Sequence, residues 1–391
     1  MNTRHLSRIT AASIALLALS GCATTAADIT ETSDLHETDS RQTRILVSDS
    51  ATGSVVVLDA TSGTALETLA LDSPGALYAL EGGRYALSVQ TDAGIVQLID
   101  GGVWEEQHGD HSHYFATDAA VAESSITGPT PVHVTQLDGT ASIFMDGDGS
   151  VHEVNLSGLA DGLAPVVEQT DDPHHGVAYR LDDGRLVSSF SDADGRATGI
   201  RLGDDGEVVA ESAACPGLHG ETEIGELLVF ACADGILALD TATATITHTP
   251  YGAEGRTGTL VSDPAGEVAY GLLAGTTLLT FDGTALDTVA LPGYGVSVAV
   301  ADGGDALVAF ADGTVARVAV DGSVVASAAL IGEFDPESGH SAPRPAVIVE
   351  GTRLYVSDPA SDSLIIAHAD NLRVIETVAL GFTPKSFALA R

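Results

Sequence analysis

The sequence predicts an all-β fold, and three patterns indicate it. From Ile45 onward, short runs of Val, Ile, Leu, Tyr and Phe alternate with turns such as "DG", "GG" and "ADG". Apolar runs between glycine-containing turns are typical of β-hairpins. There is no convincing helical period in this region. The strand-turn-strand unit also recurs, as in "VTQLDGTASIFMDGDGSVHEV", "AYRLDDGRLVSSFSDADGRATGI" and "VAVADGGDALVAFADGTVARV".

The spacing of these units predicts a β-propeller. The first turns of successive units lie at Gly139, Gly184, Gly225, Gly266, Gly303 and Gly351. The gaps are therefore 45, 41, 41, 37 and 48 residues, and four-stranded propeller blades repeat every 40 to 50 residues or so. An earlier unit turns at Gly82, and the gap of 57 residues to Gly139 leaves room for an insertion.

The two ends of the repeated region are expected to share one blade. The segment "RILVSDSATGSVVVLDATSGTALETLAL" supplies three strands without an innermost strand, which the final "PKSFALAR" could supply. We therefore predict one closed propeller over residues 43–391, with eight blades, or seven if the irregular second unit is not a full blade. A sandwich or two smaller barrels is the alternative architecture. A closed propeller needs no partner strand, so a monomer is expected.

The first residues predict export and lipidation. An apolar stretch from Ala11 to Leu19 follows two arginines and ends in Leu-Ser-Gly-Cys, the pattern of a lipobox. Residues 1–21 are thus expected to be a lipoprotein signal peptide and Cys22 the lipidated residue, which would anchor the protein on the outer face of the cell membrane. A membrane span needs about 20 apolar residues, and this run is shorter. Residues 22–42 have almost no large apolar side chains and predict a flexible tether.

The charge balance argues against nucleic acid as a partner. The chain has 16 Lys and Arg against 55 Asp and Glu, a formal net charge of −39. Loss of Arg4 and Arg8 with the signal would make this −41. Such a field repels phosphate and attracts cations.

The two remaining cysteines predict a disulfide. Cys215 and Cys232 are seventeen positions apart in a chain expected to be exported. A zinc site containing cysteine is the alternative, although neither residue belongs to a CxxC pair.

Histidines gather in the segments that would connect one blade to the next. On a propeller, these connections end at the mouth of the central channel. They read "PTPVHV", "DDPHHGVAY", "CPGLHGET" and "SGHSAPRPAVIV", and "QHGDHSHYF" lies in the insertion expected between the second and third blades. The candidate metal ligands are His108, Asp110, His111, His113, His133, His174, His175, His219 and His340. His152, His248 and His368 lie in or beside later strands and are set aside.

The donor set predicts zinc. One such histidine would more often be a hydrogen-bonded loop residue, but several segments with the same placement favour a shared site. Zinc accepts four ligands, commonly imidazole and carboxylate, and the scarcity of thiolate and thioether argues against copper(I). One buried site and a looser one in the "HGDHSHYF" loop are expected. Within that loop, His108, Asp110 and His111 are expected nearer the main site, and His113 is expected to be more mobile.

These motifs resemble the AztD family of periplasmic zinc metallochaperones. The resemblance rests on "HGDHSHYF", "GPTPVHV", "HHGVAYRLDDGRLVSSF", "CPGLHGE" and "GHSAPRPAVIVEGTRLYVSDP", and it covers most of residues 104–391 in matching order. It implies a propeller that binds Zn(II) and passes it to the solute-binding protein of a zinc ABC importer. The lipid anchor is a departure from the freely soluble family members.

Two other functions remain open on the sequence. A propeller lactonase or lyase would use metal-activated water and a carboxylate base, for which Asp110 and Glu221 are the candidates. No nucleophile elbow, P-loop or Ser/His/Asp signature is visible, so the expected protein is not an enzyme. A protein-binding propeller without a metal is the third possibility, since a fold alone does not fix function.

Overall fold

The strands expected from the glycine-punctuated runs are present, and the domain is all-β. The computed structural model describes residues 35–391 except 171, 253–254 and 340–341. Within this part, the strands form eight four-stranded sheets and one three-stranded sheet. The helical elements among these described residues are two short 3-10 turns, η1 (Thr91–Ala93) and η2 (Leu156–Asp161).

Each four-stranded sheet is an antiparallel meander. The first sheet contains β35 (Pro384–Ala390), β2 (Arg44–Asp49), β3 (Ser54–Asp59) and β4 (Ala65–Ala70). The second contains β5 (Ala76–Ala79), β6 (Tyr85–Gln90), β7 (Ile95–Asp100) and β10 (Ala120–Thr127). The third contains β11 (Pro131–Leu137), β12 (Thr140–Met145), β13 (Ser150–Asn155) and β14 (Val166–Gln169). The fourth contains β15 (Ala178–Arg180), β16 (Leu186–Ser191), β17 (Ala197–Asp204) and β18 (Glu207–Ser212).

The second half of the chain repeats the same unit. The fifth sheet contains β19 (Glu221–Ile224), β20 (Leu227–Ala231), β21 (Gly235–Asp240) and β22 (Thr245–Pro250). The sixth contains β23 (Thr257–Ser262), β24 (Ala269–Leu273), β25 (Thr277–Phe281) and β26 (Leu286–Ala290). The seventh contains β27 (Gly295–Val300), β28 (Ala306–Phe310), β29 (Thr314–Val318) and β30 (Val324–Ala329). The eighth contains β31 (Val347–Glu350), β32 (Arg353–Asp358), β33 (Ser363–His368) and β34 (Val374–Ala379).

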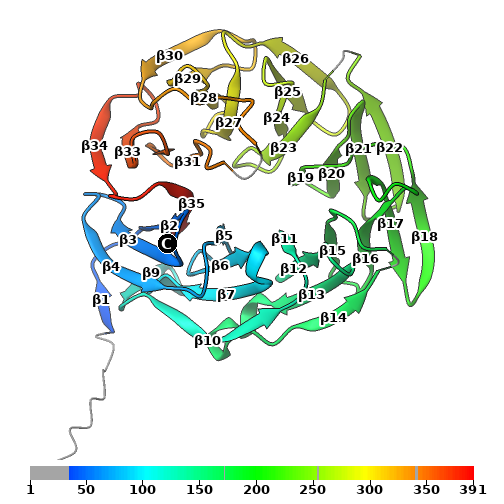
Figure 1. Ribbon diagram of the computed structural model, residues 1–391, viewed down its shortest axis with the longest axis horizontal. Helices are drawn as coiled ribbons and strands as arrows, with labels where there is room; N and C mark the ends of the chain where they lie inside the picture. Colours follow the sequence, from blue (N-terminus) through cyan, green and yellow to red (C-terminus); the bar gives the residue numbers. More distant parts are fainter. Residues whose placement is uncertain (1–34, 171, 253–254, 340–341) are drawn as a thin grey trace, which may run out of the picture. The chain divides into compact units, whose positions relative to one another are not determined.

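The sheets are arranged around a central opening, as in a propeller (Figure 1). Their first strands line the opening, and the last strands lie outermost. The middle strands are buried nearly throughout, because both faces of each sheet pack on a neighbour; β28 is an example. Hydrophobic clusters join successive sheets, and one of them joins Tyr355 of the eighth sheet to Ile45 and Phe387 of the first. The core is therefore distributed between the sheets.

The expected sharing of one sheet by the two chain ends is confirmed. β35 pairs antiparallel with β2 over Arg44↔Ala390 to Ser48↔Ser386. The last strand of the chain thus supplies the innermost strand that the first three lack.

The "HGDHSHYF" segment forms a hairpin whose place in the fold differs from the expectation. β8 (Val103–His108) pairs with β9 (His111–Ala116), and the hairpin interrupts the second sheet between β7 and β10. The expected insertion between the second and third blades is therefore wrong: β10 returns to pair with β7 after the hairpin.

The last part of the segment expected to be a flexible tether forms a β-strand. β1 (His36–Thr38) pairs with β9, joining His36 to Ala116 and Thr38 to Tyr114. The tether prediction is thus wrong for this part of residues 22–42, since backbone pairing holds it on the hairpin. The predicted signal peptide and Cys22 lie outside the described residues. Within the described part, no helix is long and apolar enough to cross a membrane.

Candidate metal centre

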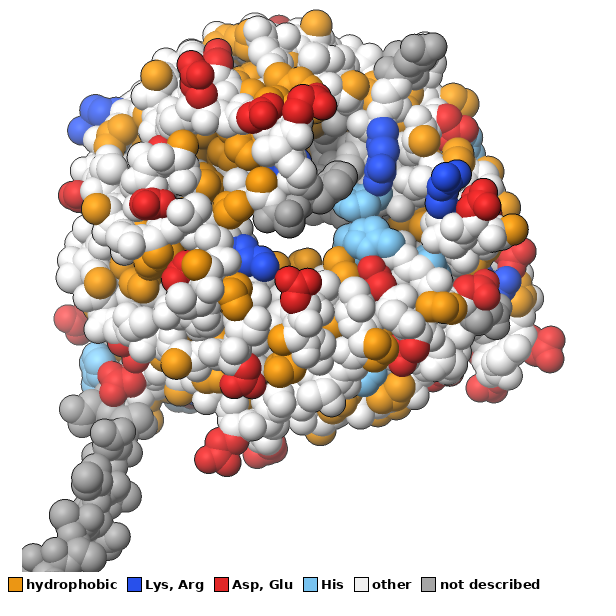
Figure 2. All heavy atoms as spheres, viewed as in Figure 1, with side chains coloured by type: hydrophobic (Ala, Val, Ile, Leu, Met, Phe, Trp, Pro, Cys, Tyr) orange, Lys and Arg blue, Asp and Glu red, His pale blue; other side chains and the backbone are white. Residues whose placement is uncertain are grey.

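Three of the predicted ligands converge from one strand and two connections between sheets. His133 lies on β11, His175 on the connection from β14 to β15, and His219 on the connection from β18 to β19. One ligand atom from each lies within 4.8 Å of the others. We call these three residues the central cluster. Histidine side chains gather at the edge of the central opening (Figure 2).

The ring nitrogens of the central cluster are spaced as zinc ligands would be. Nε2 of His133 lies 3.0 Å from Nε2 of His175. Two nitrogens bound to one tetrahedral zinc ion at about 2.0–2.1 Å lie roughly 3.3–3.4 Å apart. The ring centroids of His219 lie 5.6 Å from His133 and 5.1 Å from His175. Small side-chain movements would therefore place three nitrogens around one ion.

The other nitrogen of each ring faces an acceptor. Nδ1 of His175 donates to Asp146 Oδ2 at 2.6 Å, and Nδ1 of His219 donates to the Gly258 carbonyl oxygen at 2.7 Å. Nδ1 of His133 faces Glu221 Oε1 at 3.5 Å. These contacts place the proton on Nδ1 and leave the Nε2 lone pair directed at the cluster, which is the arrangement usual for metal-bound histidine.

Close backbone approach explains how His219 reaches its acceptor. Gly220 has φ of +93°, and a Cβ there would lie 2.9 Å from Thr259 Cα and 3.0 Å from the Gly258 backbone. Only glycine combines this conformation with this approach. The chain can therefore pass directly against β23.

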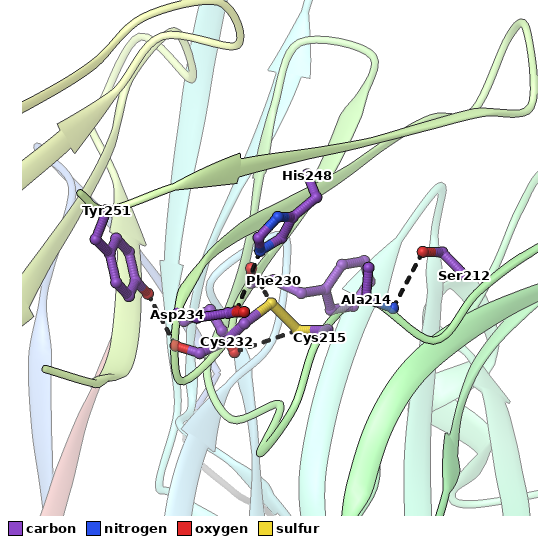
Figure 3. The surroundings of a disulfide bond; sticks show 9 residues. Ser212, Ala214, Cys215, Phe230, Cys232, Asp234, His248 and Tyr251 are labelled. Atoms are coloured by element: carbon purple, nitrogen blue, oxygen red, sulfur yellow. Dashed lines mark hydrogen bonds and ion pairs between the residues drawn. A yellow bond between two sulfur atoms is a disulfide. The ribbon is translucent and has the colours of Figure 1, made fainter. Parts of the chain in front are cut away.

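A disulfide fixes the same connection. Cys215 and Cys232 are bonded, as predicted, and join the start of the connection to the residue after β20 (Figure 3). The His219 amide donates to Ala231 O at 3.0 Å, and the Ala231 amide donates to Gly220 O at 2.9 Å. The bond also rules out the alternative of cysteine thiolates as zinc ligands. Cys232, Asp234 and His248 lie together, but this sulfur is already in the disulfide, and His248 contacts Asp234 at 3.1 Å.

Buried carboxylates set the electrostatics of the central cluster. Burial lowers the pKa of His133, but the contact with Glu221 and the charges of Glu221 and Asp146 outweigh it, so the pKa is raised. Burial lowers the pKa of His219 to about 4, which the positive charges of His133 and His175 reinforce. Without a metal, a proton on His133 Nε2 can bridge to His175 Nε2. The proton and a cation therefore compete for the same place.

One buried carboxylate oxygen beside the cluster is notable for its hydrogen bonding. Glu221 Oε2 makes no hydrogen bond to any described residue. A buried carboxylate oxygen without a donor is costly unless a positive charge lies nearby. The surplus negative charge fits a site built to hold a cation.

The hairpin carries a second, separate group of histidines. His108, His111 and His113 bring ligand atoms within 4.8 Å of one another, and we call them the hairpin cluster. Nε2 of His111 lies 3.2 Å from Nε2 of His113. Nδ1 of His111 lies 3.2 Å from Asp110 Oδ1, and Nδ1 of His113 lies 2.5 Å from Glu37 Oε1 of β1. The expectation that His108, Asp110 and His111 adjoin the main site is wrong.

His174 does not join the central cluster, contrary to its inclusion among the ligands. Its Nδ1 donates to Asp172 O at 2.8 Å, so its Nε2 accepts from the Ser189 hydroxyl at 2.7 Å. The side chain is 5% exposed and packs on Phe144. Both nitrogens are occupied, so His174 holds the loop while its neighbour His175 faces the site. His340 lies outside the described residues.

Sequence reasoning missed two carboxylates. Asp146 directly follows β12, whose last residue Met145 pairs with Pro131, two positions before His133. A strand-pairing argument could have placed it beside the site. Glu37 reaches the hairpin cluster only because β1 pairs with β9, and the composition of its segment gives no sign of that pairing.

The chain is similar in sequence and in fold to a known zinc chaperone. No family model matches the chain. It is 27% identical over 356 residues to the zinc chaperone AztD of Citrobacter koseri, covering 87% of this chain and 85% of that protein. The crystal structure of Citrobacter koseri AztD has a TM-score of 0.83 at 26% identity, covering 90% of this chain and 98% of that one. A structure of apo AztD from the same organism has a TM-score of 0.81 at 25% identity, with the same coverage. The resemblance inferred from the motifs is confirmed: this chain is AztD-like in sequence and fold over most of its length.

Proposed function

We propose that this protein is a zinc metallochaperone that holds Zn(II) on His133, His175 and His219. The observation that carries the proposal is the convergence of three imidazole rings, with one ligand atom of each within 4.8 Å of the others and Nδ1 of each facing an acceptor. Similarity to a protein named as a zinc chaperone supports the same metal and role. Zinc is the cargo of the protein.

The proposed scaffold is a closed eight-bladed propeller formed by residues 43–391. Eight four-stranded sheets and the pairing of β35 with β2 support it. We further propose that residues 1–21 are a signal peptide, that Cys22 carries lipid, and that the protein works as a monomer on the outer face of the membrane. A lipid anchor would keep it near a membrane importer.

The proposed acceptor is the solute-binding protein of a zinc ABC importer. The hairpin cluster supports transfer by ligand exchange, because the side chains of His111 and His113 are 58% and 34% exposed. An accepting protein can replace such ligands one at a time. The direction of transfer follows the relative affinities, with each 1.4 kcal/mol worth about tenfold.

Binding without catalysis is the role we propose. A metal-dependent hydrolase or lyase would need a carboxylate free to act as a base. Of the two sequence candidates, Asp110 belongs to the hairpin, and Glu221 faces His133. No observation favours a metal-free interaction protein over zinc binding.

The test is a transfer experiment with the full mature chain. The zinc-loaded protein is mixed with the metal-free solute-binding protein in the presence of a strong chelator, and zinc is measured in each after separation. We expect zinc to reach the solute-binding protein faster than the chelator removes zinc from the donor alone. Capture of all released zinc by the chelator would contradict direct transfer, and no zinc bound at the start would contradict the proposal as a whole.

A further inference from the structure

A cavity lies against the central cluster and extends away from it. It has a volume of about 440 Å³, and His219 and Gly258 form part of its wall. Two arginines, Arg256 and Arg344, also line it. Cavities of roughly 300–1,000 Å³ are the usual size for small-molecule sites. The space is therefore large enough for an organic ligand in contact with a zinc-binding histidine.

Neither arginine is paired with a carboxylate of the described residues. Arg344 donates to Ser338 O at 3.3 Å and lies over the Phe334 ring at 5.2 Å. No ion pair involves either Arg256 or Arg344 in the part of the chain that the structure describes. In a chain of net charge −39, two such guanidinium groups on one cavity create a local preference for an anion. Basic side chains lie beside the histidines at the opening (Figure 2).

The remaining lining indicates the class of anion. Leu272, Val296 and Val298 contribute apolar surface, and Tyr294 and Ser297 contribute ring and hydroxyl groups. A small organic acid has a carbon skeleton that can pack on these apolar side chains, and an inorganic oxyanion has none. Guanidinium groups bind carboxylates with two parallel hydrogen bonds, which favours this class further.

The coordination of zinc gives the anion a role. Tetrahedral zinc takes four ligands, and the central cluster supplies three nitrogens. The nearby carboxylates of Asp146 and Glu221 each use one oxygen to face a ring Nδ1, on the side of the ring away from the Nε2 of His133 and His175. An oxygen from a molecule in the cavity could occupy the fourth position beside His219.

We propose that this cavity binds a small di- or tricarboxylate, which gives one oxygen to the zinc on His133, His175 and His219 while Arg256 and Arg344 hold its other carboxylate. The inference rests on the proposed function, because it needs zinc at the central cluster. Zinc would then be received or held as a ternary complex with an organic acid.

The test uses the full mature chain loaded with Zn(II) for calorimetry and with Co(II) for absorption spectroscopy, and malate as the probe. We expect one malate per protein and a change in the Co(II) visible bands, because a new oxygen ligand enters. Arg256→Gln and Arg344→Gln should each weaken malate binding by about tenfold. Neither should lower zinc affinity in malate-free buffer, since each removes only a positive charge. Arg196→Gln is the matched control, because its exposed side chain lies near Asp194 and does not line the cavity.

Three outcomes would overturn the inference. Malate could bind equally well to all variants, it could remove zinc from all of them without forming a ternary complex, or phosphate could bind as tightly as malate. Zinc binding with no malate binding would overturn this inference alone. Failure of the chain to bind zinc would overturn the proposed function as well.

Discussion

The two histidine clusters differ mainly in their acidic partners, which are largely buried at the central cluster and exposed at the hairpin cluster. In the central cluster, the partners Glu221 and Asp146 are 13% and 14% exposed, and the ligands come from β11 and from two connections between sheets. In the hairpin cluster, Asp110 is fully exposed, and all three histidines come from one hairpin. Ligands whose second ring nitrogen faces a largely buried acceptor are held in place before the metal arrives, whereas ligands with exposed partners exchange more readily. Under the proposed function, the central cluster would therefore hold zinc and the hairpin cluster would exchange it.

The largest expected effect on zinc affinity comes from removing one histidine ligand, and it should differ between the two clusters. His219→Ala should lower the zinc affinity of the central cluster by more than about hundredfold. Loss of a residue that only hydrogen-bonds to a metal ligand typically lowers affinity 10–100-fold, and loss of the ligand itself should lower it further. His113→Ala should leave zinc binding at the central cluster unchanged and remove only the weaker zinc binding at the hairpin cluster. Competition with a fluorescent zinc chelator measures both. Equal losses in the two variants would mean that the clusters do not differ as described.

The next effect concerns the carboxylates behind the rings. Asp146→Ala should weaken tight zinc binding by about 10–100-fold, since it removes the acceptor that orients His175. Asp110→Ala is the matched change in the hairpin. It should lower zinc affinity at the hairpin cluster by no more than about threefold, because exposed contacts contribute little. The same competition titration compares them. A larger loss of zinc affinity for Asp110→Ala than for Asp146→Ala would mean that the tighter zinc site is the hairpin cluster.

The third effect is the pH dependence of the central cluster. The contact with Glu221 raises the pKa of His133 against the opposing effect of burial, so this ring keeps its proton to a higher pH. Zinc needs the neutral ring, and affinity therefore falls as pH falls through that pKa, by about tenfold per unit for each proton displaced. Glu221→Gln lowers the pKa of His133 and should move this loss to lower pH. An unchanged pH profile, measured by titration from pH 8 to pH 5, would contradict the role of Glu221.

The smallest expected effect on zinc comes from the disulfide. Cys215→Ser with Cys232→Ser should lower the free energy of unfolding by about 3 kcal/mol, because the bond closes a loop of 17 residues. Zinc affinity should fall by no more than roughly threefold, since the backbone bonds of His219 and Gly220 to Ala231 remain. Denaturant unfolding with and without zinc measures both quantities. A zinc loss comparable with that of His219→Ala would make the disulfide part of the metal site.

Sequence periodicity could predict the repeated sheets because each unit carries its own turns and apolar strands. It also selected His133, His175 and His219, since connections between repeats all reach the same end of the opening. It could not separate His174 from His175, because adjacent residues in a loop differ only in direction, and a hydrogen bond to Ser189 decides it. Sequence periodicity misplaced the hairpin because β10 pairs with β7 after the hairpin. A local sequence pattern does not reveal which strand a later strand pairs with.

Crystallography of the protein with one equivalent of zinc, with anomalous data collected at the zinc edge, tests the central claim most directly. The account predicts one strong peak at about 2.0–2.1 Å from Nε2 of His133, His175 and His219, with Nδ1 of His175 still bonded to Asp146. A first equivalent of zinc bound to the hairpin cluster, or bound through the Nδ1 atoms, would contradict it.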